Sequence, residues 1–268
     1  NWNRCVRLAR TPFVAIIHQD DRPRRGHAAI HLDALKGDPS LGMTFSAVSI
    51  IDDHGDAVSP TRIEPGGLGP QDQRFPPGGF PRCLVAGNPV RCSAVVLRTS
   101  AFVSVDGFDP EFRYAVDWDF WARLSRRWAV RWLAARTVDV RWHPASETHR
   151  FARGLLDLEE VERVIRAIDL INGPAWPPSV RQDLRRQARR YLARAFWNRA
   201  YVAAKARRPG LMRQALARAL RLQPSLLGSA LLDPRLLLLG LAAVVCPARA
   251  GSSQPTKTLS AKAGSQSS

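Results

Sequence analysis

Three apolar runs of strand length constrain the first half of this chain more than any other feature. They lie at Phe13–Ile17, Met43–Ile51 and Cys92–Arg98. Helical spacing of apolar residues precedes, separates and follows them, at residues 2–10, 26–36 and 117–127. The first run follows Pro12 and has the character of a buried strand of a parallel sheet. Strands that alternate with helices predict an α/β domain.

The second half of the chain has a different pattern. Two further short strands are expected at Val130–Leu133 and Thr137–Trp142, after a Pro- and Gly-rich segment over residues 59–90 that predicts a long loop. From about residue 150 the pattern is helical, with predicted helices at 150–171, 179–206 and 210–222. The sequence therefore predicts an α/β region over 1–150, an all-α region over 151–248 and a disordered tail over 249–268.

Two of the predicted C-terminal helices are expected to pack together. Small and aromatic residues recur at helical spacing in both of them: Ala193, Phe196, Trp197, Ala200, Tyr201 and Ala204 in one, and Ala215, Ala219 and Leu222 in the other. Spacing of three and four residues places each set on one helix face. The predicted helix over 117–127 likewise has Phe120, Trp121 and Leu124 on its inner side.

The net charge of +17 is concentrated in the helical half. Residues 1–146 carry 19 basic and 15 acidic side chains, a net +4, and residues 147–268 carry 21 and 8, a net +13. Arg185, Arg186, Arg189, Arg190 and Arg194 crowd one stretch. Such a region favours anionic partners, either nucleic acid or an anionic membrane face. A solvated helix face explains the same charge, and no nucleic acid partner is expected because no nucleic-acid-binding motif is recognised.

Several features bear on the compartment. The cysteines form no CxxC pair and indicate free thiols in a reducing compartment: Cys5, Cys83, Cys92 and Cys246. The opening residues lack the apolar core of a signal peptide. The longest apolar stretch, Leu226–Cys246, is interrupted by Asp233-Pro234-Arg235, which favours a core helix or an interfacial segment over a membrane span. A cytoplasmic protein, peripheral on the inner face of the cell membrane, is expected.

An acidic pair follows the first predicted strand directly. The segment is His18-Gln19-Asp20-Asp21. Ligands of α/β sheets bind at the carboxyl ends of strands, and two adjacent carboxylates hold a hard divalent cation, which in turn holds a diphosphate. The alternative is a solvated turn or a helix cap, which uses the same residue types.

Two more positions carry reactive side chains. Asp117 and Asp119 stand at the start of a predicted helix, where a carboxylate is either a cap stabilised by free N–H groups or, in a cleft, a general base. His143 stands at the end of a predicted strand, where a histidine serves as a metal ligand, a phosphate partner or a structural residue.

The order of these motifs resembles the family 2 glycosyltransferases, inverting enzymes with the GT-A fold, over residues 1–150. Asn3–Arg10, Phe13–Ile17 and His18–Asp21 resemble the segment, strand and DxD-type motif of that family. Val105–Asp109 is similar to its GGFD turn, and Val116–Leu124 is similar to its EDWDLWLRL helix start. His143 with Ser146 and Thr148 resembles RxHxxSxT. Two departures are His18 in place of the first acidic residue of DxD and Val116 in place of a glutamate.

The resemblance implies a role for each matching residue. Asp20 and Asp21 bind Mg²⁺ or Mn²⁺ and the diphosphate of a nucleotide-sugar donor, and His143 contacts the metal or the leaving diphosphate. Asn3 and Arg4 are implied to bind the nucleotide-sugar donor. Neutralising the leaving diphosphate and activating the attacking hydroxyl on the opposite face are the two needs of such a transfer.

On the acceptor side, the resemblance makes Asp117 the base that deprotonates the acceptor hydroxyl, with Asp119 as a nearby support. The acceptor implied is a glycan or a lipid-linked sugar. The family's domain begins with strands that hold the nucleotide base, and we expect these to be missing, which would expose an apolar sheet edge and leave the chain inactive or poorly stable. A non-catalytic scaffold and a basic nucleic-acid-binding protein are the alternatives.

Overall fold

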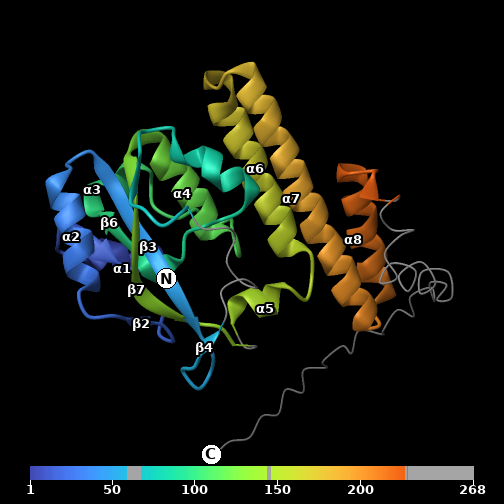
Figure 1. Cartoon of the computed structure of the whole chain (residues 1–268), viewed down its shortest axis with the longest axis horizontal. Helices are drawn as coiled ribbons and strands as arrows, with labels where there is room; N and C mark the ends of the chain where they lie inside the picture. Colours follow the sequence, from blue (N-terminus) through green and yellow to red (C-terminus); the bar gives the residue numbers. More distant parts are fainter. Residues whose placement is uncertain (59–67, 144–145, 227, 229–268) are drawn as a thin grey trace, which may run out of the picture.

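The computed structural model describes residues 1–58, 68–143, 146–226 and 228. A twisted sheet with helices on both faces continues into a set of long helices that extends to one side (Figure 1). This confirms the predicted α/β class and the all-helical C-terminal region. The predicted tail over 249–268 and nearly all of Leu226–Cys246 lie outside the described residues. No helix in the part that is described has both the length and the apolar character needed to cross a bilayer.

The sheet is mixed rather than parallel. Its strands are β1 (Phe13–Ala15), β2 (Arg22–Pro23), β3 (Leu41–Ile51), β4 (Ala57–Val58), β5 (Gln73–Phe75), β6 (Val95–Arg98) and β7 (Ala129–Arg141). The order is β1-β6-β3-β7-β2, with β4 on β3 and β5 on β7. Among the strands of the described residues, only β3 and β7 pair in parallel. Because β6 is antiparallel to both β1 and β3, the strands β1, β3 and β7 point in one direction and end at a common edge, called here the carboxyl edge.

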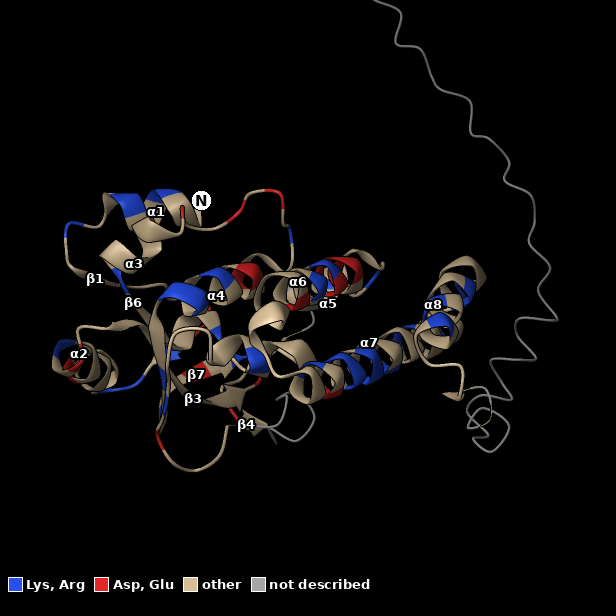
Figure 2. Ribbon diagram, turned by 90° about the horizontal axis from the view of Figure 1, so that it is seen from above, with Lys and Arg blue, Asp and Glu red and all other residues tan. Residues whose placement is uncertain are grey.

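Helices cover the two faces of the sheet unequally. The first-half helices are α1 (Trp2–Leu8), α2 (His27–Gly37), α3 (Thr99–Ser104) and α4 (Val116–Arg127). Leu35 of α2 packs on Leu41 and Val96 at one face, and α1, α3 and α4 lie on the other side, with Met43 and Leu97 in the main core (Figure 2). Successive strand residues such as Val96 and Leu97 point to opposite faces, which is why the first three residues of β6 are all apolar and buried.

The C-terminal helices begin as part of the same core. They are α5 (Glu147–Phe151), α6 (Leu156–Asn172), α7 (Pro178–Lys205) and α8 (Pro209–Leu222). Val164 and Ile168 of α6 and Leu184 of α7 are buried in the main core with the sheet residues. The far half of α7 packs on α8 through Ala200 and Ala215, which are fully buried and confirm the predicted helix pair.

Strand β1 corrects one prediction. Phe13–Ile17 is not a buried strand of a parallel sheet; it forms the three-residue edge strand β1, antiparallel to β6, with Phe13 and Val14 half-buried and Ala15 exposed. The apolar run does not distinguish a central strand from an edge strand, because pairing with residues more than 80 positions away decides the neighbours.

Strand β7 corrects a second prediction. Val130–Leu133 and Thr137–Trp142 are not two strands but lie in or beside the single strand β7. Leu133 pairs with Ser46 and Arg136 with Ala47, so two extra residues of β7 bulge between adjacent partners. A bulge interrupts the alternation of burial without ending the strand.

The predicted loop over 59–90 is a third correction. Within its described part, β5 and a 3₁₀ segment over Phe80–Ala86 are regular structure. Phe80 and Leu84 are fully buried, and the Phe80 ring lies 5.3 Å from that of Phe45. The segment therefore contributes to the main core, and its Pro and Gly residues mark turns within it rather than one long loop.

Candidate active site

Four chain segments meet at the carboxyl edge. Residues 18–21 follow β1, residues 52–53 follow β3, and residues 142–143 follow β7. Because β6 runs the other way, the residues before it, 91–94, arrive at the same edge. The sheet directions therefore bring together side chains that are far apart in sequence, at the place where α/β sheets bind ligands.

The acidic pair and its histidine form one cluster at this edge. The ligand atoms of His18, Asp20 and Asp21 lie within 4.8 Å of one another, and all three residues are partly buried. The β7 segment holds both carboxylates in place: His143 Nε2 lies 3.0 Å from Asp20 Oδ2, and the Arg141 backbone N–H donates to Asp21 Oδ1 at 2.9 Å. The cluster is thus built by two strand ends rather than by a local turn.

The protonation of Asp20 suits cation binding. Partial burial raises the pKa of Asp20, but the hydrogen bond with His143 and the nearby histidines outweigh it, and the pKa lies below its ordinary value. Asp20 is therefore an anion at neutral pH. The sequence predicted His143 as a metal ligand. In the structure its ring contacts Asp20, a position from which it would orient that carboxylate toward a metal.

His18 completes the donor set. Its backbone N–H donates to Ser93 Oγ at 3.0 Å, and its ring stacks on Trp2 with centroids 5.6 Å apart. Its Nε2 is buried and has no hydrogen-bond partner among the described residues. Buried polar atoms without a partner are rare. One imidazole nitrogen and two carboxylates are donors that Mn²⁺ accepts, and the carboxylates alone suit Mg²⁺, so the residues fit a divalent cation.

Asp117 lies on the other side of the same site. Its Oδ2 accepts from the Asn88 amide at 3.2 Å, and its Oδ1 accepts from the Trp118 backbone N–H at 2.7 Å. Burial raises the pKa of Asp117, and the Trp118 N–H, Arg91 and His18 offset only part of that rise. Such a carboxylate is a stronger base than an exposed aspartate.

Cys92 shows how close the two halves of the site are. Burial raises the pKa of its thiol well above the ordinary value, and the charges of Asp117 and Asp21 raise it further. Both carboxylates therefore lie near enough to Cys92 to act on its thiol. The structure thus brings the predicted base to the same side of the sheet edge as the predicted metal-binding pair.

The helix that carries Asp117 is positioned by α6. The carboxylate of Glu160 accepts hydrogen bonds from the backbone N–H groups of Arg113, Tyr114 and Ala115, at 2.7 to 3.1 Å. Ala115 is the residue before α4 and offers no side-chain cap of its own. Glu160 thus supplies from a distant helix the cap that the local sequence lacks.

Asp119 is not brought to the cluster. Its carboxylate binds Arg123 at 2.7 Å, and Arg123 donates in turn to the carbonyls of Val105 and Gly107. Burial raises the pKa of Asp119, an effect that Arg123 counters. These contacts hold the predicted turn, in which Asp106 and Gly107 have φ of 59° and 66°. Asp119 therefore stabilises the turn from the opposite face of α4, rather than supporting Asp117.

Asn3 and Arg4 also differ from their predicted roles. The Asn3 side chain donates to the Phe108 carbonyl at 2.7 Å and accepts from the Phe108 N–H at 2.8 Å, so both of its polar atoms bind the turn. Arg4 is exposed on α1 and has no hydrogen bond or ion pair with the residues described. It is Trp2, through its stacking on His18, that links α1 to the cluster.

Sequence reasoning missed five residues around the site: Trp2, Asn88, Arg91, Ser93 and Glu160. Arg91 precedes the predicted strand Cys92–Arg98 and Ser93 lies at its start. If that strand had been predicted as antiparallel, both residues would have been placed at the carboxyl edge. Glu160 carries no local signal, because its partners lie more than 40 positions earlier in the chain.

Comparison with known proteins adds one relative. No protein-family profile matches the chain. The chain is 29% identical over 187 residues to an uncharacterized protein, MT1568, of Mycobacterium tuberculosis (strain CDC 1551 / Oshkosh). The match covers 68% of this chain and 57% of that protein, so the chain spans little more than half the length of its relative. The likeness brings no activity with it, since the relative is itself described only as uncharacterized.

Proposed function

We propose that this protein is an inverting glycosyltransferase of the GT-A type, which moves a sugar from a nucleotide-diphosphate donor to a hydroxyl of a glycan or lipid-linked acceptor. One observation carries the proposal. A cluster of donors that fits a divalent cation and a partly buried carboxylate of raised pKa lie at the carboxyl edge of an α/β sheet, both near enough to Cys92 to raise the pKa of its thiol. These are the two groups that such a transfer requires.

The donor side of the proposed reaction rests on the cluster. His18, Asp20 and Asp21 would hold Mg²⁺ or Mn²⁺, whose positive charge neutralises the leaving diphosphate. His143 and the Arg141 N–H orient the two carboxylates, as hydrogen-bonded partners of metal ligands do. Trp2 closes one side of His18 and limits its contact with water.

The acceptor side rests on Asp117. Its carboxylate removes the proton of the attacking hydroxyl, and its raised pKa strengthens it as a base. The Asn88 amide and the Trp118 N–H fix the direction of its oxygens. A single base acting on a hydroxyl that attacks opposite the diphosphate inverts the anomeric carbon.

The first experiment measures nucleoside diphosphate release and sugar transfer with Mn²⁺ and a panel of nucleotide-sugar donors. Asp117→Asn is expected to lower turnover by about a hundredfold or more while Mn²⁺ binding, followed by electron paramagnetic resonance, stays unchanged. Asp20→Asn is expected to weaken Mn²⁺ binding itself. Asp53→Asn is the matched control, an exposed carboxylate beside the cluster that should change neither quantity.

Two results would contradict the proposed enzyme function or the assignment of its base. If the purified protein binds neither Mn²⁺ nor any nucleoside diphosphate, the enzyme proposal fails and a non-catalytic role takes its place. If Mn²⁺ binds but Asp117→Asn turns over as fast as the wild-type protein, the cluster stands and the assignment of the base is wrong.

A further inference from the structure

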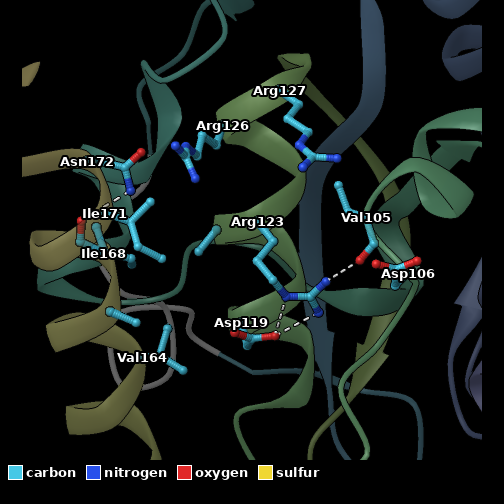
Figure 3. A pocket seen from close by; sticks show the side chains of 12 residues that line it. Val105, Asp106, Asp119, Arg123, Arg126, Arg127, Val164, Ile168, Ile171 and Asn172 are labelled. Atoms are coloured by element: carbon cyan, nitrogen blue, oxygen red, sulfur yellow. Dashed lines mark hydrogen bonds and ion pairs between the residues drawn. The ribbon is translucent and has the colours of Figure 1, made fainter.

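A cavity lies on the far side of α4 from Asp117. It has a volume of about 260 Å³ and opens between α4 and α6 (Figure 3). Its wall is apolar and is formed by Val105, Ala122, Val164, Ala167, Ile168 and Ile171. None of these residues takes part in the candidate active site, so the cavity is a separate feature.

The mouth of this cavity is cationic. Arg123 is neutralised by Asp119, but Arg126 has no hydrogen bond or ion pair with any residue described. Arg127 donates to the Ser104 carbonyl at 2.6 Å and likewise has no carboxylate partner in the described part of the chain. Figure 3 shows Arg126 and Arg127 at the upper end of α4, and Asp106 beside Val105 on the side of α4 away from α6. The cavity lining thus carries two guanidinium groups without a carboxylate partner among the described residues, against one such carboxylate, Asp106.

Large apolar side chains are exposed at the ends of α3 and α6, the two helix ends next to residues that line this cavity. Leu170 is 74% exposed and Ile171 is 45% exposed at the end of α6. Val103 is 63% exposed at the end of α3, and its carbonyl accepts from the N–H of Asp106, which lines the cavity. Exposed apolar residues flanked by arginines are typical of surfaces that lie on a membrane, where the apolar groups enter the acyl boundary and the guanidinium groups bind phosphates.

We propose that this surface, formed by Val103, Arg126, Arg127, Leu170 and Ile171, docks the protein on an anionic phospholipid bilayer. Leu170, Ile171 and Val103 enter the interface, and Arg126 and Arg127 bind lipid phosphates at the cavity mouth. The surface differs from the basic stretch of α7, the site expected from sequence, and it does not depend on sugar transfer.

The basic stretch of α7 is a poorer membrane surface. Figure 2 shows Lys and Arg along much of α7, but Arg185 is paired with Asp169 and Arg186 with Asp183. Val202 of α7 is also exposed, at 56%, but it lies about two helical turns beyond Arg194, and none of the described residues 185–194 is a large exposed apolar side chain. Charge without apolar insertion gives weak, salt-sensitive attraction.

The test is co-sedimentation of the full chain with vesicles of phosphatidylglycerol or of phosphatidylcholine. Binding is expected only to phosphatidylglycerol and is expected to weaken with salt. Arg126→Glu should lower the partition coefficient about tenfold or more, because it replaces an attracted charge with a repelled one. Leu170→Ser should lower it several-fold. Arg190→Glu on exposed α7 is the matched control and should have a much smaller effect.

Several results would overturn the proposal. They are the absence of binding to phosphatidylglycerol vesicles, an equal loss in Arg126→Glu and Arg190→Glu, or full binding by Leu170→Ser. Circular dichroism melts of all variants show whether the fold is kept, and these side chains are exposed enough that it should be. Transfer to a water-soluble acceptor should be unchanged in Arg126→Glu, so failure here and failure of the glycosyltransferase proposal are separate results.

Discussion

In the helical region, buried charged side chains pair with one another, whereas at the carboxyl edge of the sheet some buried polar groups do not. In the helical region, Arg199 and Asp157 form a buried ion pair with side chains only 10% and 6% exposed. Asp169 likewise binds two arginines, which hold its pKa at about 2. At the carboxyl edge, burial raises the pKa of Asp117, and His18 Nε2 has no partner within the described residues.

The difference separates groups that stabilise the fold from groups that are available to a ligand. Matched charges in the helical region satisfy one another and leave nothing for a ligand to bind. Buried polar groups that stay unmatched lower stability, and proteins retain them mainly where they are used. The comparison therefore predicts that substitutions in the helical region reduce stability and that substitutions at the carboxyl edge reduce function instead.

The largest effect on the free energy of unfolding is expected for Arg199→Ala. The change leaves the buried Asp157 carboxylate without its partner and should cost about 3–5 kcal/mol in urea denaturation. Arg186→Ala removes an exposed ion pair with Asp183 and is the control, with no measurable loss. Similar losses for both variants would show that the helical region does not depend on its buried pair.

Arg123→Ala is expected to cost about 2–3 kcal/mol, because it leaves the Asp119 carboxylate and the Val105 and Gly107 carbonyls without a donor. This side of α4 should behave like the helical region. Thermal unfolding measures the loss. The variant should keep its Mn²⁺ affinity, and a selective loss of Mn²⁺ binding without a loss of stability would place Asp119 in the site after all.

Acid is expected to destabilise the sheet half through His31. Burial, helped by the charge of His27, lowers the pKa of His31 from 6.5 to about 3. His31 therefore binds a proton near pH 6.5 in the unfolded chain but not in the folded chain. The free energy of unfolding consequently decreases as the pH falls below 6.5. Between pH 7 and pH 5 the loss should be roughly 2 kcal/mol. His31→Gln should flatten this dependence in urea denaturation at each pH; an unchanged slope contradicts it.

The smallest change in stability is expected for Asp117→Asn. Because burial raises the pKa of Asp117, its ionised form opposes folding, and this cost grows as the pH rises through that raised pKa. The amide should therefore leave stability within about 0.5 kcal/mol of wild type, or raise it, while turnover falls. A clear destabilisation at pH 8 would mean that Asp117 is a structural group like Asp119.

The helices were predictable because their signals are local. Phe120, Trp121 and Leu124 follow one helix face by spacing alone, and all three are fully buried. The same holds for Ala200 and Ala215 between α7 and α8. The α/β order and the clustering of Asp20 with Asp21 also followed from residues that are adjacent in sequence.

The remaining features depend on contacts across the chain. The His18 N–H and Ser93 Oγ bond across 75 positions, and that contact follows from the antiparallel direction of β6, which no apolar run reveals. Asp117 and Asp119 look equivalent in sequence, yet two positions on a helix place them on opposite faces, one toward Asn88 and the other toward Arg123. Their environments, rather than their residue type, separate their roles.

Arg141 links two strand ends in a way that should be visible in amide hydrogen exchange. Its guanidinium donates to the carbonyls of Asp20, Asp52 and Asp53, so the segment after β1 and the turn after β3 are fastened to one side chain. An ion that orders Asp20 should then slow exchange at Gly55 and Asp56, whose N–H groups bond to Asp52 within that turn. The turn would report occupancy of the cluster without touching the ion.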